Sequence, residues 1–414
     1  MAEEDSIPLV DRPIEMGLTG PTTTVFLVGV MAGSGTLVIP KALSDAGWSG
    51  ILIILAMAAA STYTAILLGR CLTILRSRHV EYHGHIRGPY PAIGQAAFGK
   101  VCRCLITVCV DFSSFGTCVA YLLLIAENIG FLVARFGFDM PYYYWLLAVV
   151  LVLCPLCWFG SPKDFTFIGV IAAVATGVAC VIILSQMAID AQRVPPAIHG
   201  PVLLKPFLMA FGTICLGFGG HPAIPTILVD MKHPEKYVTS ITPAFLIVVL
   251  IYLPLSLVGF LVYGSNLNPN VLLTITPGPA IFTVQILMSV HLLTGFVLLL
   301  NPVCQEGEDL LNIPHQFGLR RVLFRTALLA LTFIIAIAIP NFGVILAFLG
   351  GSTVTALVFI LPPVLYLRLC AMTGTWDKID IPLHEKVLCV EIIVVGGLAG
   401  ATATFSAVEA LVSG

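Results

Sequence analysis

The sequence predicts an all-α polytopic membrane protein with eleven membrane-spanning helices. The chain has 414 residues, of which 58% are hydrophobic and only 10% are charged, whereas soluble domains carry about 25% charged residues. Apolar runs of about 20 residues, the length that crosses a bilayer, can be drawn eleven times. The formal net charge of −2 gives no indication of nucleic-acid binding.

The eleven apolar runs have similar lengths and cover residues 21–44, 48–75, 102–134, 142–160, 164–189, 203–228, 238–264, 279–302, 322–340, 342–369 and 386–412. The segment before Pro21 is polar and acidic, unlike a cleaved signal peptide, so we expect the first span to be retained. We expect a cytoplasmic tail over residues 1–20, a transmembrane core of ten spans over 21–370, and a loop with the eleventh span over 371–414.

The basic residues indicate that the N-terminus is cytoplasmic. In that orientation, the few basic residues on the opposite side, among twenty Lys and Arg in all, are Lys41, Arg135, Arg193 and Lys205. Cytoplasmic loops of membrane proteins carry an excess of Lys and Arg. Removing one span would invert every later loop, so the charge pattern also supports eleven spans.

The first span contains the segment Gly29–Pro40, with the sequence GVMAGSGTLVIP. Its glycines each weaken a helix by about 1 kcal/mol relative to alanine. Irregular backbone at membrane depth is tolerated only where it is buried in protein or lines a cavity. We therefore expect a break in this helix, at Ala32, Gly33, Ser34 and Gly35.

The sixth span repeats the pattern in GTICLGFGGHP, residues Gly212–Pro222. Tight helix packing is the alternative explanation for either glycine cluster alone, since small residues let membrane helices approach closely. The two clusters lie five spans apart, so their helices cross the membrane in opposite directions. That relation predicts an inverted repeat of five plus five spans, followed by one extra span.

The two predicted breaks would recognise a zwitterion. Freed N–H groups around residues 32–35, at the positive end of a half-helix, suit a carboxylate. Freed carbonyl groups around Gly217, Phe218 and Gly219 suit an ammonium group. Because no charged side chain lies in either break, a neutral amino acid is favoured. Phe218 and Tyr121 are candidates for the side-chain pocket, although ordinary helix packing also accounts for each.

Ionisable groups inside spans are costly and are candidates for function. His221 lies at the break of span six, and an unperturbed imidazole exchanges its proton near physiological pH; the alternative is a structural histidine that holds the break open. Asp111 is the acid well inside span three, whereas Glu127 lies near that span's outer end. Glu391 and Glu409 lie near the ends of span eleven, outside the repeat.

His291 and Thr294 share one face of span eight because three residues separate them. A hydroxyl group on span eight can complete a sodium site against the carbonyl groups of span one, so Thr294 keeps sodium coupling open. Packing is the alternative role for a threonine in a membrane helix. The sequence thus offers four candidates for ion coupling, which are His221, Asp111, His291 and Thr294.

Four motifs resemble those of the amino acid/auxin permease family. They are MAGSGTLVIP at Met31–Pro40 followed by Ala46–Trp48, YPAIGQAAFG at Tyr90–Gly99, GHPAIP at Gly220–Pro225 with MKHPEKY at Met231–Tyr237, and the pair Glu127-Asn128. They occur in family order along the whole chain. The resemblance is nearest to the vacuolar and vesicular neutral amino acid branch.

This resemblance implies a LeuT-like fold with broken helices one and six. It also implies secondary active transport of amino acids coupled to protons or sodium. The leading hypothesis is a proton-coupled transporter of small neutral amino acids that works by alternating access. A sodium-coupled symporter and an amino acid sensor without transport remain alternatives. No enzyme motif such as HExxH or GxSxG is present, so we expect no catalytic residues, no cofactor apart from H⁺ or Na⁺, and no metal site.

Other features bear on location and partners. The twelve cysteines lie mostly in apolar spans or beside basic loops, so we expect buried thiols rather than disulfides. The cluster His79, His83 and His85 is expected to be solvated rather than metal-binding. Residues Glu3–Val10 weakly resemble an acidic dileucine sorting signal, which favours a vacuolar, lysosomal or vesicular membrane over the plasma membrane. The expected partners are the amino acid substrate and the lipid bilayer, and no obligate protein partner is evident.

Overall fold

A computed structural model describes residues 17–83, 86–135, 137, 140–159, 165–314, 316–374, 376 and 378–413, with the backbone alone for 165–171. The α-helices are α1 (Gly20–Met31), α2 (Gly35–Ala46), α3 (Ser49–Arg78), α4 (Pro89–Phe98), α5 (Lys100–Ala134), α6 (Tyr142–Trp158), α7 (Phe165–Asp190), α8 (Leu204–Gly217), α9 (Ile224–Val229), α10 (Val238–Tyr263), α11 (Pro279–Leu310), α12 (Leu319–Ala338), α13 (Phe342–Leu349), α14 (Leu361–Ala371) and α15 (Leu383–Ser413). The expected tail over residues 1–20, with the sorting-like segment Glu3–Val10, lies almost wholly outside the described residues.

The described helices form an all-helical membrane protein. Eight helices are long and apolar enough to cross a membrane, and the pair α1 and α2 makes a ninth if counted as one span bent by 58°. Two shorter apolar helices, α6 and α8, fall below that length in the part of the chain that is described. The first span is therefore broken where the glycines predicted.

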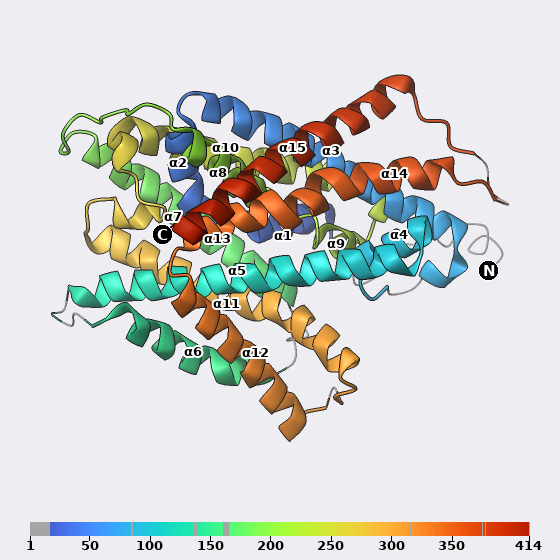
Figure 1. Cartoon of the computed structure of the whole chain (residues 1–414), viewed down its shortest axis with the longest axis horizontal. Coiled ribbons are helices and arrows are strands. Elements are labelled where there is room, and N and C mark those ends of the chain that lie inside the picture. The colour runs from blue at the N-terminus through green and yellow to red at the C-terminus, as the bar shows by residue number, and fades with distance from the viewer. Residues whose placement is uncertain are drawn as a thin grey trace.

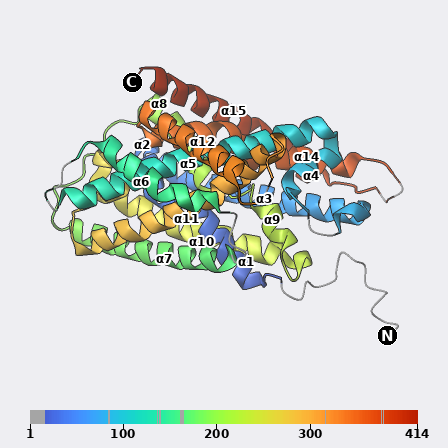
Figure 2. The same ribbon diagram turned by 90° about the horizontal axis from the view of Figure 1, so that it is seen from below.

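The broken helices lie in the interior of the bundle, as Figure 1 shows for α1, α2 and α8. The long helix α5 crosses the molecule, and α6 and α12 pack side by side below it. Figure 2 places α7 and α15 on opposite faces. Helix α11 packs along α5 and α7, so α5, α6, α11 and α12 form a continuous group that we call the scaffold.

The helix ends rich in basic residues gather on one side of the molecule. Arg70 near the end of α3 pairs with Glu385 at the start of α15, with N–O distances of 3.2 Å. Arg87, which precedes α4, pairs with Asp309 at the end of α11 at 2.6 Å. Arg368 of α14 donates to the Ala97 carbonyl oxygen of α4 at 3.3 Å. These contacts join loops that the charge pattern assigns to the same side.

Two features were not expected from the sequence. The polar insert between spans two and three contains the helix α4, packed against α5. The tenth apolar run is not a uniform α-helix, because two π-helical segments, η7 (Gly350–Val354) and η8 (Ala356–Ile360), join α13 to α14. Helix α8 approaches η7 so closely that a Cβ atom added to Gly350 would overlap the Gly212 carbonyl oxygen. Such contact requires glycine on both helices.

The structure also shows the surroundings of the cysteine thiols and of the loop histidines. All twelve cysteines are free, and most are buried. In the histidine cluster, Nε2 of His83 lies 2.7 Å from the Arg76 carbonyl oxygen, so that ring is bonded to backbone. His85 lies outside the described residues. Within the described part of the chain, no group of three or more His, Cys, Asp or Glu side chains could hold a metal ion.

Candidate functional site

The first break consists of Ala32, Gly33 and Ser34, between α1 and α2. The Ala32 N–H group still donates to the Val28 carbonyl oxygen at 2.7 Å, which closes α1. Helix α2 then begins at Gly35, and the Thr36 hydroxyl group donates to the Gly33 carbonyl oxygen at 2.8 Å. The first N–H groups of a helix have no partner within it. The break therefore directs N–H groups into the protein interior at the positive end of α2.

The second break runs from Phe218 to Ala223, between α8 and the short helix α9. Local hydrogen bonds are retained at the end of α8, since the Gly219 N–H group donates to the Leu216 carbonyl oxygen at 2.9 Å. The chain then turns through His221 and Pro222 before α9 begins at Ile224. Because α8 ends here, its last carbonyl groups lie at the negative end of a helix.

The two breaks are in contact. A Cβ atom on Gly35 would lie 3.3 Å from the Gly217 Cα atom, so the two backbones touch. Tyr252 of α10 joins them: its hydroxyl oxygen lies 2.6 Å from the Met31 carbonyl oxygen and 3.0 Å from the Gly217 carbonyl oxygen. That same Cβ atom would lie only 2.1 Å from the Tyr252 hydroxyl oxygen. Glycine at position 35 is therefore required by this packing.

Two further side chains cover the first break. A Cβ atom on Gly33 would lie 2.8 Å from Nε2 of His291 and 3.1 Å from the Tyr121 hydroxyl oxygen. Tyr121 comes from α5 and packs against Gly295 of α11, where an added Cβ atom would lie 2.9 Å from its ring. The structure thus brings Gly33, Tyr121 and His291 together, although they are far apart in the sequence.

The hydrogen bonds of His291 define which ring nitrogen faces the break. Its Nδ1 atom lies 3.1 Å from the Thr176 hydroxyl oxygen and 3.3 Å from the Ala172 carbonyl oxygen, both on α7. The Thr176 hydroxyl group donates to that same carbonyl oxygen at 2.9 Å. A carbonyl oxygen can only accept, so Nδ1 carries the hydrogen of the neutral ring. The basic Nε2 atom is left facing Gly33.

His221 lies in the second break and faces α3. Its Nε2 atom lies 2.9 Å from the Thr64 hydroxyl oxygen, and its ring contacts Phe245 of α10 edge-on. The ring is completely buried, and Nδ1 has no hydrogen-bond partner among the described residues. The contacts of His221 are therefore with α3 and α10 rather than with the first break.

Three candidates remain, of which Phe218 belongs to the second break. Phe218 packs in an aromatic cluster with Phe245 and Tyr252 and is fully buried. Thr294 donates its hydroxyl group to the His291 carbonyl oxygen of its own helix at 2.8 Å. Asp111 is half-buried on α5, opposite Glu306 near the C-terminal end of α11. The breaks instead bring together Ala32, Gly33, Ser34, Gly35, Gly217, Gly219, Tyr121 and His291.

A polar cavity of about 170 Å³ lies between α2, α8 and the start of α13, on the side away from α4. Its lining includes Lys41 and Asp45, which form an ion pair at 2.7 Å on successive turns of α2. Thr213 of α8 and Asn341 also line it. The cavity therefore reaches the two half-helices that flank the contact between the breaks.

Tyr252 and Thr176 were not singled out from the sequence. Each is a lone polar residue in a strongly apolar run, and a buried tyrosine hydroxyl group usually finds a hydrogen-bond partner. That rule marks Tyr252 as a residue with an internal partner. It does not identify the partner, because the Met31 carbonyl oxygen becomes available only once α1 has ended.

Comparison with solved structures identifies the fold, because the structural neighbours of this protein have the LeuT fold. The structure aligns with that of MhsT in complex with L-phenylalanine at a TM-score of 0.57, with 10% identity, covering 96% of this chain and 99% of MhsT. A manganese transporter of Eremococcus coleocola aligns at 0.56, with 13% identity, covering 94% and 86%. At these identities the likeness concerns the fold.

The sequence then defines the family. The pattern of the transmembrane amino acid transporter protein family matches residues 16–406, so the chain belongs to this family, the amino acid/auxin permeases, and is a transporter rather than an enzyme. It is 27% identical over 402 residues to the amino acid transporter AVT1E of Arabidopsis thaliana, covering 93% of this chain and 72% of that protein. AVT1C of the same plant is 26% identical over 430 residues, covering 100% and 74%.

Proposed function

We propose that this protein is a secondary active transporter that moves small neutral amino acids together with protons by alternating access. The observation that carries the proposal is the contact between the two breaks at Gly35 and Gly217. One break supplies N–H groups at the start of a half-helix, and the other supplies carbonyl groups at the end of one. A carboxylate and an ammonium group on one carbon atom match this pair.

Charge and space favour a small neutral substrate. The first break carries no charged side chain, and His221 in the second break faces α3. A charged substrate side chain would therefore lack a partner, which is costly in a buried site. Space is restricted because Gly33 and Gly35 lie directly against His291, Tyr121 and Tyr252. These contacts favour a small amino acid such as alanine.

His291 is our candidate for the proton carrier. Its Nε2 atom faces Gly33, while Nδ1 is held by Thr176 and Ala172. A proton taken up at Nε2 would place a positive charge beside the first break, where the substrate carboxylate is expected. Thr294, the sodium candidate, gives its hydroxyl hydrogen to its own helix. The arrangement supports proton coupling better than sodium coupling.

We also propose the full topology of eleven spans. Length and composition define up to nine spans among the described helices. The short apolar helix α6 and the broken pair of α8 and α9 would add the two that are missing from eleven. The contact between the breaks of spans one and six then has the geometry of a five-plus-five inverted repeat. With the basic ends of α3 and α14 on the cytoplasmic side, the polar cavity at Lys41 would open to the lumen or the exterior.

We propose residence in a vacuolar, lysosomal or vesicular membrane, in keeping with the branch that the motifs resemble.

Uptake by purified protein in liposomes tests the function. We expect radiolabelled alanine to accumulate when a pH gradient is imposed without sodium, and a protonophore to abolish the accumulation. His291→Gln should lose accumulation driven by the pH gradient but keep alanine exchange, because the breaks remain intact. Thr294→Val is the matched control on the same helix and should behave like the wild type.

The opposite pattern would overturn the coupling. Alanine uptake driven by a sodium gradient alone, lost in Thr294→Val and intact in His291→Gln, would assign the ion site to Thr294. Binding of alanine without transport under any gradient would instead support the sensor hypothesis.

A further inference from the structure

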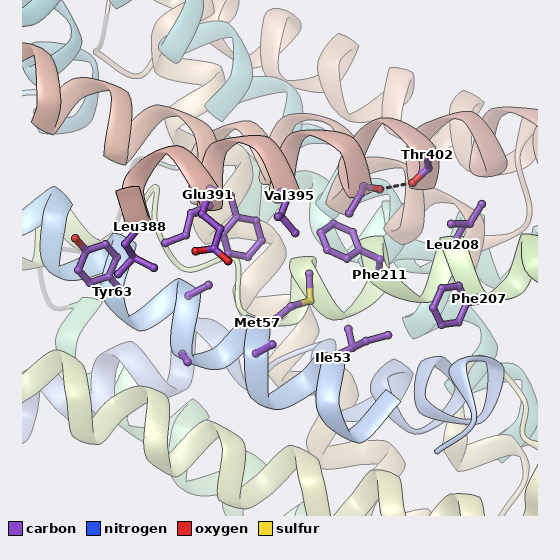
Figure 3. Close-up of a pocket in the computed structure, with 17 residues that line it drawn as sticks. Ile53, Met57, Tyr63, Phe207, Leu208, Phe211, Leu388, Glu391, Val395 and Thr402 are labelled. Carbon is purple, nitrogen blue, oxygen red and sulfur yellow. Dashed lines mark hydrogen bonds between the residues drawn. The ribbon is translucent and has the colours of Figure 1, made fainter. Parts of the chain in front are cut away.

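An apolar groove of about 640 Å³ separates α15 from α3 and α8. Figure 3 shows it from the side, with Ile53 and Met57 of α3 below and Leu388 and Val395 of α15 above. Phe207 and Phe211 of α8 close one end. Helix α15 packs on α8, α13 and α14. The groove lies where α15 is separated from α3.

The groove lies within the bilayer. It follows α15 from Leu388 to Thr402, about 21 Å at 1.5 Å per residue. Helix α15 has 31 residues and is about 46 Å long, against a hydrocarbon core of about 30 Å. If α15 is centred in the membrane, the groove falls inside the hydrocarbon, and Glu391 lies about 4 Å below its cytoplasmic boundary. Its occupant therefore comes from the membrane.

Glu391 is the carboxylate among the residues that line the groove, and the other ionisable side chain there, Tyr63, has its hydroxyl group 3.8 Å from the Cys389 Sγ atom. Its carboxyl group points into the groove in Figure 3 and has neither a hydrogen-bond partner nor an ion pair within the described chain. The Thr402 hydroxyl group is already used, since it donates to the Ala399 carbonyl oxygen at 2.9 Å. An unpartnered carboxyl group inside a membrane is costly. A ligand that donates a hydrogen bond to Glu391 would remove that cost.

Size and charge restrict the occupant. A membrane-spanning helix about 10 Å wide and 30 Å long fills roughly 2,400 Å³, which is far more than the groove holds. The phosphate group of a phospholipid and the carboxylate of a fatty acid would be repelled by Glu391. The ring faces of Phe207, Phe211 and Phe359, with small residues such as Gly396 and Ala60 between the helices, leave a slot for a flat molecule.

We propose that this groove binds a sterol, with its hydroxyl group donating to the Glu391 carboxylate and its fused rings lying between α3 and α15. The apolar body then occupies the slot and extends along α15 toward Thr402. The occupant enters from the bilayer, because Glu391 also lines the outer surface of α15 beside Val390 and Val394. The site is separate from the breaks and does not depend on the transported substrate.

Photolabelling tests the proposal on the whole protein in phosphatidylcholine nanodiscs. The probe is a cholesterol analogue with a free 3β-hydroxyl group and a diazirine in its tail, and mass spectrometry maps the labelled peptides. We expect labels on α3 and α15 that unlabelled cholesterol displaces. Ala399→Phe fills the groove and should abolish labelling. Ala401→Phe, two residues along the same helix but facing outward, should label like the wild type.

The hydroxyl contact has its own test. Cholestenone has a ketone in place of the hydroxyl group and cannot donate, so it should displace the probe about tenfold less well than cholesterol, as expected for a hydrogen bond to a charged group. In Glu391→Leu the two competitors should become equal. Equal labelling of Ala399→Phe and wild type, or labels confined to other helices, would each overturn the sterol site. Equal competition by cholestenone in the wild type would overturn the role of Glu391.

Discussion

Two regions of the protein bury polar groups in the protein interior, and they do so in opposite ways. At the breaks, glycine backbone is brought together and N–H and carbonyl groups remain directed at one point. In the scaffold, Arg325 of α12 donates to Glu308 and Asn301 of α11 and to two carbonyl oxygens at the end of α6. The difference indicates that the scaffold is fixed by its own bonds, whereas under the proposed function the breaks are completed by a ligand.

Local sequence explains the contrast. The scaffold helices α5 and α11 are continuous over 35 and 32 residues, and the buried ion pair between Glu308 of α11 and Arg325 of α12 joins helices without interrupting them. Helices α1 and α2 are 12 residues each, and Gly35 meets Tyr252 at a distance that no side chain could share. Short helices that end inside the protein can tilt at their ends, which is what alternating access requires.

The largest expected effect is in the scaffold. Glu308→Leu would leave Arg325 and Arg321 without their buried carboxylate, and breaking a buried ion pair costs about 3–5 kcal/mol. We expect a large fall in the midpoint of thermal unfolding, measured in detergent. Replacing both partners, in Glu308→Leu with Arg325→Met, should recover part of the loss. A single variant as stable as the wild type would show that the network does not fix the scaffold.

The next effect concerns the contact between the breaks. Gly35→Val should abolish alanine binding in a scintillation proximity assay, because its side chain would overlap Tyr252 and Gly217. Gly177→Val on α7 is the control, since an added Cβ atom meets no other atom within 4 Å there. The Gly35→Val variant should still be inserted in the membrane and should be monodisperse after purification. Normal alanine binding by a folded Gly35→Val protein would contradict the site.

Tyr252→Phe should have an intermediate effect. It removes the hydroxyl group that joins the Met31 and Gly217 carbonyl oxygens, at a cost of about 1–3 kcal/mol for a buried acceptor left unpaired. We expect weaker alanine affinity and a modest fall in the midpoint of thermal unfolding, which stays modest because the ring still packs against Phe218. Tyr263→Phe, at the other end of the same helix, should leave alanine affinity unchanged.

The smallest effect is expected where the chain enters α1. The Leu18 N–H group donates to the Asp230 carbonyl oxygen at 2.7 Å, and the Lys232 N–H group donates to the Leu18 carbonyl oxygen at 2.8 Å. These bonds tie the start of α1 to the end of α9. Leu18→Pro removes one donor, about 1 kcal/mol, and should slow alanine exchange modestly without changing alanine affinity. Gly20→Ala serves as the control because it is not part of this pairing. An unchanged exchange rate would show that the two half-helices move independently.

The sequence predicted the breaks well because glycine and proline act locally. Gly33 and Gly35 weaken one helix wherever the rest of the chain lies, and the structure breaks that helix at Ala32–Ser34. His291 was predicted as an ion-coupling candidate because it is an ionisable residue inside a span and shares a face of that span with Thr294. Its partner Thr176 was not, because no local pattern relates a residue on α7 to one on α11.

The parts that could not be predicted depend on packing between distant segments. The sequence of the π-helical segments at Gly350–Ile360 does not differ from that of an ordinary apolar helix. In the structure, Gly212 of α8 packs directly against this segment at Gly350. The ring of Phe218, a candidate for the side-chain pocket, packs against Phe245, which lies 27 positions later in the chain. Sequence showed which helices break. Only packing showed which side chains meet at the breaks.

The measurement that tests the account most directly is a pair of distances in the membrane. Spin-labelled unnatural amino acids at Pro21 on α1 and Leu310 on α11 report the distance between the first half-helix and the scaffold. Labels at Val101 on α5 and Leu319 on α12 report a distance within the scaffold. Electron paramagnetic resonance would follow both distances with and without alanine and a pH gradient. We expect the first distance distribution to shift by several ångströms and the second to stay unchanged. If the first stays fixed, or both shift together, the division into a moving pair of breaks and a fixed scaffold is wrong.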